Sequence, residues 1–263
     1  TTAQLERYTL RSITENPTGR PIVAQLIGND PAALVSAARQ LQRYPVAAID
    51  LNLGCPAPIV YRKCAGGGLL RFPERIDAIL GALRDAVSIR FTVKTRIGFD
   101  DPAMLDRLLP IFARHQPDLV TVHGRTRMQF YTGTANWARI APVVEAIKLP
   151  VIANGDIESG ESAREAMKQS GAAGVMIGRG AEGRPWRLAE ISHGVFGTPY
   201  REPTREEKLA SMLDQVAGCV SLYGDRLGVR VVRKHVAAFV DAWCEDHGLP
   251  PMAETRVALC RIE

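Results

Sequence analysis

The residue best suited to chemistry is Cys55, which lies in the segment NLGCPAPIVYRKCAGGGLL directly after a predicted strand. Gly54 and Pro56 favour a tight turn that exposes the thiol, and the glycine run at 65–68 is expected to keep the following loop flexible. A thiol with an ordinary pKa of ~8.5 is protonated at neutral pH, so it can donate a proton, or act as a nucleophile once ionised. The alternatives are that Cys55 is a small buried hydrophobe, or that Cys64 in the same loop is the reactive thiol.

Lys94 and His123 are predicted to point toward one interior from the ends of two neighbouring strands. Lys94, in VKTRIG, alternates with small or apolar residues and faces the same side as Arg96. A buried ammonium needs an anion or an electron-rich group, so Lys94 indicates a ligand. The structural alternatives are an ion pair of Lys94 with Asp50 or Asp156, and a His123, in VHGRTR, that is only a satisfied core histidine.

Two glycine-containing turns, ANGDI and MIGRGA within 153–157 and 174–181, end the last two predicted strands. Backbone N–H groups of such turns commonly bind a phosphate at the corresponding place in barrel enzymes. A glycine at a strand-to-helix turn can also be present only for its backbone freedom. Because the two turns are adjacent, we expect a phosphorylated ligand.

Six short apolar runs, each bounded by Gly, Asn or Asp, position these residues and are predicted to be strands. Helical patterns separate the runs, and their continuous apolar character is typical of parallel strands covered on both faces. The runs are PIVAQLIG (21–28), AAIDLNLG (47–54), FTVKTRIG (91–98), LVTVHGR (119–125), VIANGDI (151–157) and VMIGRGA (175–181). Polar residues stand at or near their carboxyl ends, namely Gln25, Asn52, Lys94, His123 and Asn154. This arrangement predicts an α/β fold of the TIM-type (β/α)8 barrel class, in which the carboxyl ends form the active-site rim.

Eight strands close such a barrel, and the sequence supplies six. The segments 209–223 and 229–240 repeat apolar residues at helical spacing and cannot provide the other two. We therefore expect the first two strands to precede Thr1, with residues 5–13 forming the helix or connection after the second one. The sequence thus predicts a chain that lacks the beginning of its barrel.

A composition break rich in Gly, Thr and Pro at 197–204 separates the predicted barrel from the helical tail. Thr204, with Glu207 three residues later, predicts a capping box at the start of the first tail helix. We expect a barrel domain over residues 1–200 and a helical domain over residues 201–263.

The cysteine pattern and the overall composition exclude several classes of protein. The five cysteines are scattered without CxxC spacing, which argues against a disulfide framework and a structural zinc site and favours a reducing cytoplasm. With 46% hydrophobic and 23% charged residues, and no run near the roughly 20 apolar residues of a membrane span, the chain is predicted to be globular. Neither a membrane nor a metal ion is expected as a partner.

The net charge of +5 permits a polyanionic partner, and its distribution indicates where that partner would bind. Arg230, Arg233 and Lys234 share one helix face by their spacing and could contact phosphates. A solvated face paired with acids such as Asp241 is the alternative. Further cations are expected around the barrel mouth, namely Arg62, Lys63, Arg96, Arg125 and Arg127.

Seven motifs occur in an order that resembles the tRNA dihydrouridine synthase (Dus) family, most closely its bacterial B-type branch. They extend over residues 21–235 and are AQLIG, DLNLGCP followed by V-x-RK-x-AGG-x-LL, VK-x-R-x-G, VHGRTR, IANGDI, MIGRGAEGRPW and VVRKHV. Any one motif could arise by chance, but seven in order are specific. The family's opening Ala-Pro-Met motif would precede Thr1, and its helical domain usually extends past residue 263.

The resemblance implies an FMN-dependent oxidoreductase that reduces the C5=C6 bond of particular uridines in tRNA, with NADPH or NADH as the reductant. It implies that Cys55 is the proton donor and that Asn52 lies beside the target base. The residues implied to contact FMN are Gln25, Lys94, His123, Asn154, Gly155, Asp156, Gly178 and Arg179. The residues expected to contact tRNA are Arg62, Lys63, Arg96, Arg125, Arg127, Arg230, Arg233 and Lys234. A cytoplasmic monomer is expected.

Two other functions share part of this pattern. An FMN-dependent barrel reductase of a free pyrimidine or enone, similar to dihydroorotate dehydrogenase, would have the phosphate turns and a cysteine at the rim without needing a basic tail. A non-catalytic RNA-binding relic would keep the basic tail and lack the flavin.

Overall fold

Six parallel strands form one sheet, and their order in the sheet is their order in the sequence. The structure, a computed structural model, describes residues 6–262. A strand lies at each of the six predicted runs, and each strand ends one or two residues before the next glycine. The strands are β1 (Val23–Leu26), β2 (Ala48–Asn52), β3 (Arg90–Arg96), β4 (Leu119–His123), β5 (Val151–Asn154) and β6 (Gly174–Met176).

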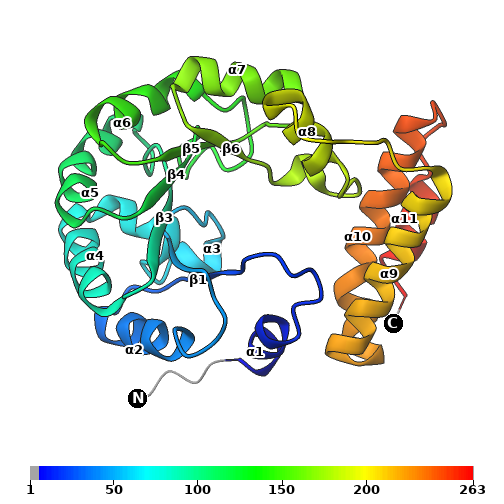
Figure 1. Ribbon diagram of the computed structural model, residues 1–263, viewed down its shortest axis with the longest axis horizontal. Helices are drawn as coiled ribbons and strands as arrows, with labels where there is room; N and C mark the ends of the chain where they lie inside the picture. The colour runs from blue at the N-terminus through cyan, green and yellow to red at the C-terminus, as the bar shows by residue number, and fades with distance from the viewer. Residues whose placement is uncertain (1–5, 263) are drawn as a thin grey trace. The chain divides into compact units, whose positions relative to one another are not determined.

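Helices follow the strands and lie along the outer side of the curved sheet (Figure 1). They are α2 (Pro31–Leu41), α4 (Pro73–Ala86), α5 (Leu109–His115), α6 (Ala141–Ala146) and α7 (Gly160–Ser170). Asp30 caps α2 by accepting from the Ala32 N–H at 2.9 Å, and Pro31 takes the first helical position, as predicted. Sheet and helices share a core in which Ile49, Phe91 and Leu80 are fully buried. The alternation of parallel strands and covering helices confirms the TIM-type (β/α) barrel class.

Several short elements were not predicted from the sequence. They are α1 (Arg7–Thr14), α3 (Pro58–Tyr61) and the 3-10 helices η1 (Gly66–Arg71), η2 (Pro102–Arg107), η3 (Trp137–Ile140) and η4 (Arg179–Ala181). Of these, α1 overlaps the helix or connection expected over residues 5–13 and ends one residue later; Leu5 lies outside the described residues. The most consequential is η1, because the glycine run expected to be a flexible loop is a buried helical turn.

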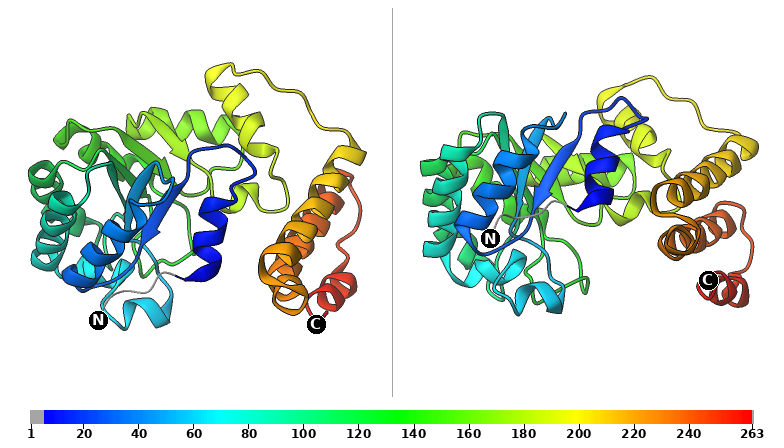
Figure 2. Two further views of the ribbon diagram at one scale, coloured as in Figure 1. Left: turned by 60° about the horizontal axis from the view of Figure 1, so that its bottom comes forward. Right: turned by 90° about the horizontal axis from the view of Figure 1, so that it is seen from below.

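The tail over residues 201–263 is helical, as predicted, and its elements are α9 (Arg205–Tyr223), α10 (Asp225–Asp246) and α11 (Ala253–Leu259). Helix α8 (Arg187–Phe196) precedes it and was not predicted. The predicted capping box at Thr204 and Glu207 is present at the start of α9. Helices α9 and α10 run side by side (Figure 2) around a cluster of Met212, Val232 and Phe239. Helix α10 can approach α9 closely because Gly228 has no side chain: a Cβ there would lie 2.6 Å from the Cα of Val220.

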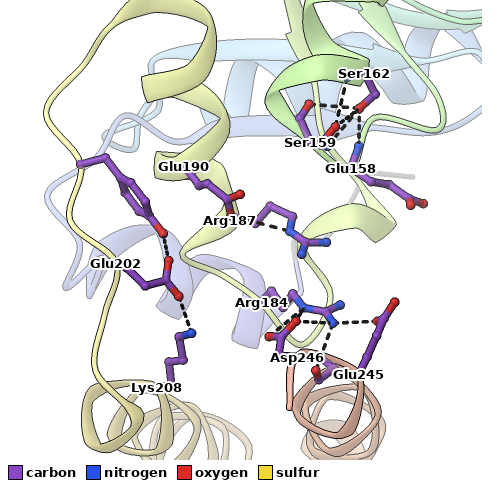
Figure 3. A network of polar contacts seen from close by, with 12 residues as sticks. Glu158, Ser159, Ser162, Arg184, Arg187, Glu190, Glu202, Lys208, Glu245 and Asp246 are labelled. Atoms are coloured by element: carbon purple, nitrogen blue, oxygen red, sulfur yellow. Dashed lines mark hydrogen bonds and ion pairs between the residues drawn. The ribbon is translucent and has the colours of Figure 1, made fainter. Parts of the chain in front are cut away.

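Arg184 fixes the turn before α8 onto α10 (Figure 3). Its guanidinium donates to Glu245 at 2.7 Å, to Asp246 at 2.8 Å and to the carbonyl of Ala242 at 3.0 Å. A second chain of contacts runs from Tyr200 to Glu202 and from Glu202 to Lys208 on α9. The segment that follows β6 is therefore packed into the helical tail.

By its internal packing the chain divides into two units. The first contains the residues up to Ile157 and Arg164–Met176, and the second contains Glu158–Ala163 and the residues from Ile177 onward. The domain boundary expected near residue 200 falls inside the second unit, between α8 and α9, and stays a prediction. None of the described helices is long and apolar enough to cross a bilayer.

Candidate active site

The register of the sheet brings the predicted polar residues into neighbouring rows at the carboxyl ends of the strands. Asn52 on β2 pairs with Lys94 on β3, and His123 on β4 pairs with Asn154 on β5. One row below, Gln25 on β1 pairs with Asp50 on β2. The five strand-end residues predicted from sequence therefore come together along one edge of the sheet.

A chain of hydrogen bonds links the buried carboxylate of Asp50 to the Cys55 turn. Asp50 accepts from the Thr92 hydroxyl at 2.6 Å and from Gln25 Nε2 at 2.7 Å. Gln25 Oε1 accepts from Asn52 Nδ2 at 2.7 Å. Asn52 Oδ1 in turn accepts from the Cys55 backbone N–H at 2.9 Å. The position of the Cys55 backbone thus depends on side chains from three strands.

The glycine run packs against Cys55, and the expectation that it makes the loop flexible is wrong. Cys55 is half-buried, and its carbonyl accepts from the Gly67 N–H at 3.0 Å. A Cβ on Gly66 would lie 2.9 Å from the Cys55 Cβ, and a Cβ on Gly68 would lie 2.6 Å from the carbonyl oxygen of Tyr61. The glycines are needed for close packing, so the run holds Cys55 in place.

Cys64, the competing thiol, is also half-buried and lies just after α3, at a φ of 52°. All five cysteines are free. Cys55 is the one whose backbone belongs to the hydrogen-bonded chain from Asp50.

Lys94 is half-buried beside Asp50, and each changes the pKa of the other. Burial lowers the pKa of the Lys94 ammonium, the positive charge of Arg96 lowers it further, and the negative charge of Asp50 opposes both. Burial raises the pKa of Asp50 despite its hydrogen bonds to Thr92 and Gln25. Lys94 is therefore a desolvated cation at the strand ends, suited to contact an electron-rich group.

His123 is buried and uncharged at neutral pH. Burial and the nearby positive charges of Arg96 and Lys94 lower its pKa to about 3. Its Nδ1 atom is buried and has no hydrogen-bond partner within the described residues. A polar atom in this state normally has a partner, so Nδ1 points to a ligand contact. The satisfied core histidine, which the sequence left open, is not what the structure contains.

Arg96 and Arg125 hold backbone rather than lying open at the barrel mouth. Arg96 donates to the carbonyls of Gly54 at 2.8 Å and of Phe130 at 3.1 Å. Arg125 is 2% exposed and makes a two-pronged ion pair with Asp156, at 2.7 and 2.6 Å. Both arginines were predicted to contact tRNA at the barrel mouth, and that contact stays a prediction. Alternation along a strand does not predict where a long guanidinium side chain ends.

The Asn154-Gly155-Asp156 turn is tied to the loop that follows β4. Asp156 accepts from the Ala135 N–H at 2.7 Å, in addition to its ion pair with Arg125. Gly155 has a φ of 111°, and a Cβ there would lie 2.8 Å from Ala135 and 3.3 Å from Nε2 of His123. Only glycine fits this position, because both the backbone conformation and the space exclude a side chain.

The remaining cations differ in exposure. Arg62 and Lys63 are exposed just after α3, whereas Arg127 is nearly buried, with its guanidinium 3.6 Å from the ring centre of Tyr61. Gly178 and Arg179 are exposed and belong to the second unit.

On α10, Arg230 and Lys234 are exposed, while Arg233 is half-buried and donates to the carbonyl of Ile262 at 3.1 Å. Asp241, the acid considered as a partner for this face, pairs with Arg256 instead, at 2.7 Å. Their contacts with RNA stay predictions.

Sequence reasoning considered Asp50 only as an ion-pair partner of Lys94 and missed its hydrogen bonds to Gln25 and Thr92. An acidic residue inside the apolar run AAIDLNLG was the available signal for Asp50, because a buried carboxylate must have partners. Thr92 gave no signal, since threonine is common in strands.

The fold and the site together define a (β/α)-barrel protein with a cysteine, a desolvated lysine and a neutral histidine at the carboxyl ends of its strands. The family model for dihydrouridine synthase (Dus) matches residues 1–249, and the chain belongs to this family. The chain is 40% identical to the "Probable tRNA-dihydrouridine synthase" of Rhodobacter capsulatus, over 85% of this chain and 70% of that protein. It is 38% identical to the "tRNA-dihydrouridine synthase B" of Xanthomonas axonopodis pv. citri, over 92% of this chain and 72% of that protein.

Proposed function

We propose that the protein is a tRNA-dihydrouridine synthase, which reduces the C5=C6 bond of uridine in tRNA with FMN and NADPH. Family membership and the names of the curated relatives support this function. The observation that carries it at the level of residues is the chain Asp50–Gln25–Asn52, which holds the Cys55 turn beside Lys94. A fixed thiol next to a desolvated cation suits proton delivery to a substrate that gains negative charge.

The residues present fit a bound flavin. The unpartnered Nδ1 of His123 and the half-buried ammonium of Lys94 are polar groups that need partners, and a flavin ring offers nitrogen and oxygen atoms to both. Contact of Gly178 and Arg179 with the flavin phosphate stays a prediction from the family resemblance. When bound, FMN reduced by NADPH supplies the hydride for C6 of the uracil ring.

The chain's own side chains then bind the base and supply the proton. Oδ1 of Asn52 accepts from the backbone N–H groups of Gly54 and Cys55, and one Nδ2–H of Asn52 donates to Gln25. Asn52 can therefore contact a ligand through its second Nδ2–H. An N–H donor suits a uracil carbonyl oxygen. Cys55 donates the proton from Sγ to C5 of the base, and Lys94 stabilises the negative charge that develops before this transfer. Because the target base is stacked in tRNA, it must be turned out of its stack to reach the strand ends.

The test is a reaction of the purified protein with FMN, NADPH and an unmodified tRNA transcript, with dihydrouridine measured by mass spectrometry. The Cys55→Ala variant should keep NADPH-dependent flavin reduction and lose dihydrouridine formation by a factor of about 100 or more, because only the second half-reaction needs the acid. Cys64→Ala is the matched control and should keep both half-reactions.

Three outcomes would contradict the proposal in different ways. Equal loss of both half-reactions in Cys55→Ala would remove Cys55 as the proton donor. Reduction of free uridine as readily as of tRNA would favour the small-molecule reductase. A protein that retains no flavin and forms no dihydrouridine would favour the non-catalytic RNA-binding relic.

A further inference from the structure

The loop after β4, residues 124–136, has a backbone held by two buried arginines. Arg96 donates to the carbonyls of Thr126 and Phe130, both at 3.1 Å. Arg125 donates to the carbonyls of Thr132 and Gly133. Hydrogen bonds from a buried, charged guanidinium to a carbonyl are among the stronger ones in a protein. The backbone of the loop is therefore held along most of its length.

Despite this rigid backbone, the tip of the loop exposes large apolar side chains. We call residues 128–131 the aromatic tip; Met128 is 56% exposed, Phe130 42% and Tyr131 45%. The rings of Phe130 and Tyr131 form an edge-to-face pair with centres 4.4 Å apart. Phe130 also has a φ of 51°, a conformation that costs energy for a bulky residue and clusters at functional sites. The fold thus maintains a strained backbone that presents an aromatic ring to solvent.

The charges around the aromatic tip are positive. Arg125 is neutralised by its ion pair with Asp156, which leaves Arg127 in segment 124–136 and Arg62 and Lys63 in segment 58–63. Neither segment contains an acidic residue. The guanidinium of Arg127, which stacks on Tyr61, brings the two segments together. In the part of the chain that the structure describes, Arg62 and Lys63 have no carboxylate partner.

Two acidic residues, Asp100 and Asp101, lie near the aromatic tip because they follow Phe99, whose carbonyl accepts from the Met128 N–H. Asp100 accepts from the Asp101 N–H, and Asp101 accepts from the Ala103 N–H. Within the described residues neither carboxylate forms an ion pair with Arg62, Lys63 or Arg127. Three cations against two acids leave a small positive balance, which permits a polyanion.

We propose that the aromatic tip is a stacking surface for an unpaired base of the RNA substrate. Exposed aromatic rings flanked by cations are the means by which proteins bind single-stranded RNA, with stacking on the ring and attraction of the phosphates. The loop begins directly after His123, so the tip belongs to the same edge of the sheet as the site. An enzyme that turns a base out of its stack needs such a surface nearby to hold the exposed strand. The inference rests on the proposed function, whose substrate it shares.

The test compares tRNA affinity between the wild-type protein and the Phe130→Ala variant. Loss of one stacking contact should raise Kd for an unmodified tRNA transcript by about 5- to 150-fold. The slope of log Kd against log salt should not change, because no phosphate contact is removed. Phe130→Tyr keeps the ring and should bind within about twofold of wild type. Leu188→Ala, at an exposed apolar position on α8, is the matched control and should bind like wild type.

If Phe130→Ala does not fold, a fluorescence measurement tests whether the side chain at position 130 stacks on a base. In the Phe130→Trp variant, tRNA binding should quench more tryptophan emission than it quenches in wild type, because the new indole stacks on a base. An unchanged Kd in Phe130→Ala, or no added quenching in Phe130→Trp, would overturn the inference and leave the tip to a protein partner. If wild type binds tRNA and forms no dihydrouridine, the proposed function fails while the Kd ratio still decides the stacking surface. If wild type does not bind tRNA, both fail.

Discussion

The carboxylate of Asp50 determines which way two amide side chains face. An ionised carboxylate only accepts hydrogen bonds, so Gln25 must present its NH2 group to Asp50 and its oxygen to Asn52. Asn52 must then donate to Gln25 and can accept from the Cys55 N–H. The buried charge of Asp50 thus sets the orientation of the Gln25 and Asn52 amides, which hold the backbone of the proposed proton donor, Cys55.

This hydrogen-bond chain predicts different effects for two substitutions of Asp50. Asp50→Asn can keep the chain, because Oδ1 accepts from Gln25 while the new NH2 group donates to the Thr92 hydroxyl. Asp50→Ala leaves the Gln25 amide without a fixed orientation, and misplacement of the Cys55 turn should lower kcat for dihydrouridine formation by about 10- to 100-fold. Asp50→Asn should stay within about threefold of wild type. Equal losses in the two variants would show that the charge beside Lys94, and not the chain, is what matters.

His123 predicts a pH dependence of stability. Its pKa is about 3 in the folded chain and ordinarily 6.5, so below pH 6.5 the unfolded chain binds a proton that the folded chain does not. The free energy of unfolding is therefore highest above pH 6.5 and falls as the pH approaches 3. Between pH 7 and pH 5 wild type should lose about 2 kcal/mol relative to His123→Gln, measured by urea unfolding of the flavin-free proteins. Parallel curves for the two proteins would mean that His123 is accessible to protons in the folded state.

At the scale of elements, the strands could be predicted and the glycine run could not. Each strand is a continuous apolar run with a glycine or polar end, and that pattern is local to the sequence. Three consecutive glycines suggest flexibility because glycine loses the most entropy on ordering. Here the neighbours that require them, the Cys55 turn and the backbone of Tyr61, provide the compensating contacts. Tertiary packing, which is not visible in the pattern, decided the outcome.

Gly68→Ala tests whether η1 is close-packed. The new Cβ would lie 2.6 Å from the carbonyl oxygen of Tyr61, which is backbone and cannot easily move, so we expect a loss of about 1–3 kcal/mol in stability. Gly218→Ala on α9 is the matched control, because a Cβ there meets nothing within 4 Å and alanine favours the helix by up to about 1 kcal/mol. Thermal unfolding of both variants measures the difference. A Gly68→Ala protein as stable as Gly218→Ala would mean that η1 can adjust, as a flexible loop does.

Across the whole molecule, the class of the fold and the position of the polar residues at the strand ends followed from the sequence, whereas the hydrogen-bond partners of those residues did not. Asp50 accepts hydrogen bonds from Gln25 and Thr92, at sequence separations of 25 and 42 residues. Arg96 donates to the carbonyls of Thr126 and Phe130, at separations of 30 and 34 residues. Such partners depend on strand register, which a single sequence does not contain. The fixing of Arg184 onto α10 by Glu245 and Asp246 is a further example, since neither the GRPW segment nor the helix indicates its partner.

The helical tail provides the prediction that belongs to the whole molecule. On α10, Arg230 and Lys234 are exposed, whereas Arg233 is engaged with the Ile262 carbonyl, so the first two are the cations available to phosphates. The double variant Arg230→Glu/Lys234→Glu should weaken tRNA binding about tenfold or more and reduce the magnitude of the salt slope by about 2. Its flavin content should match that of wild type, because neither residue is among those proposed to contact FMN.

Lys148→Glu/Lys168→Glu separates a local contact from the effect of net charge. Both lysines are exposed and lie in the barrel part of the chain, and this variant changes the net charge by the same amount. If α10 contacts tRNA, the control should lose less affinity and keep the salt slope of wild type, because it removes no phosphate contact. Equal losses in the two double variants would show that only the overall field attracts tRNA. In that case the basic face of α10 would be the solvated helix face that the sequence left as its alternative.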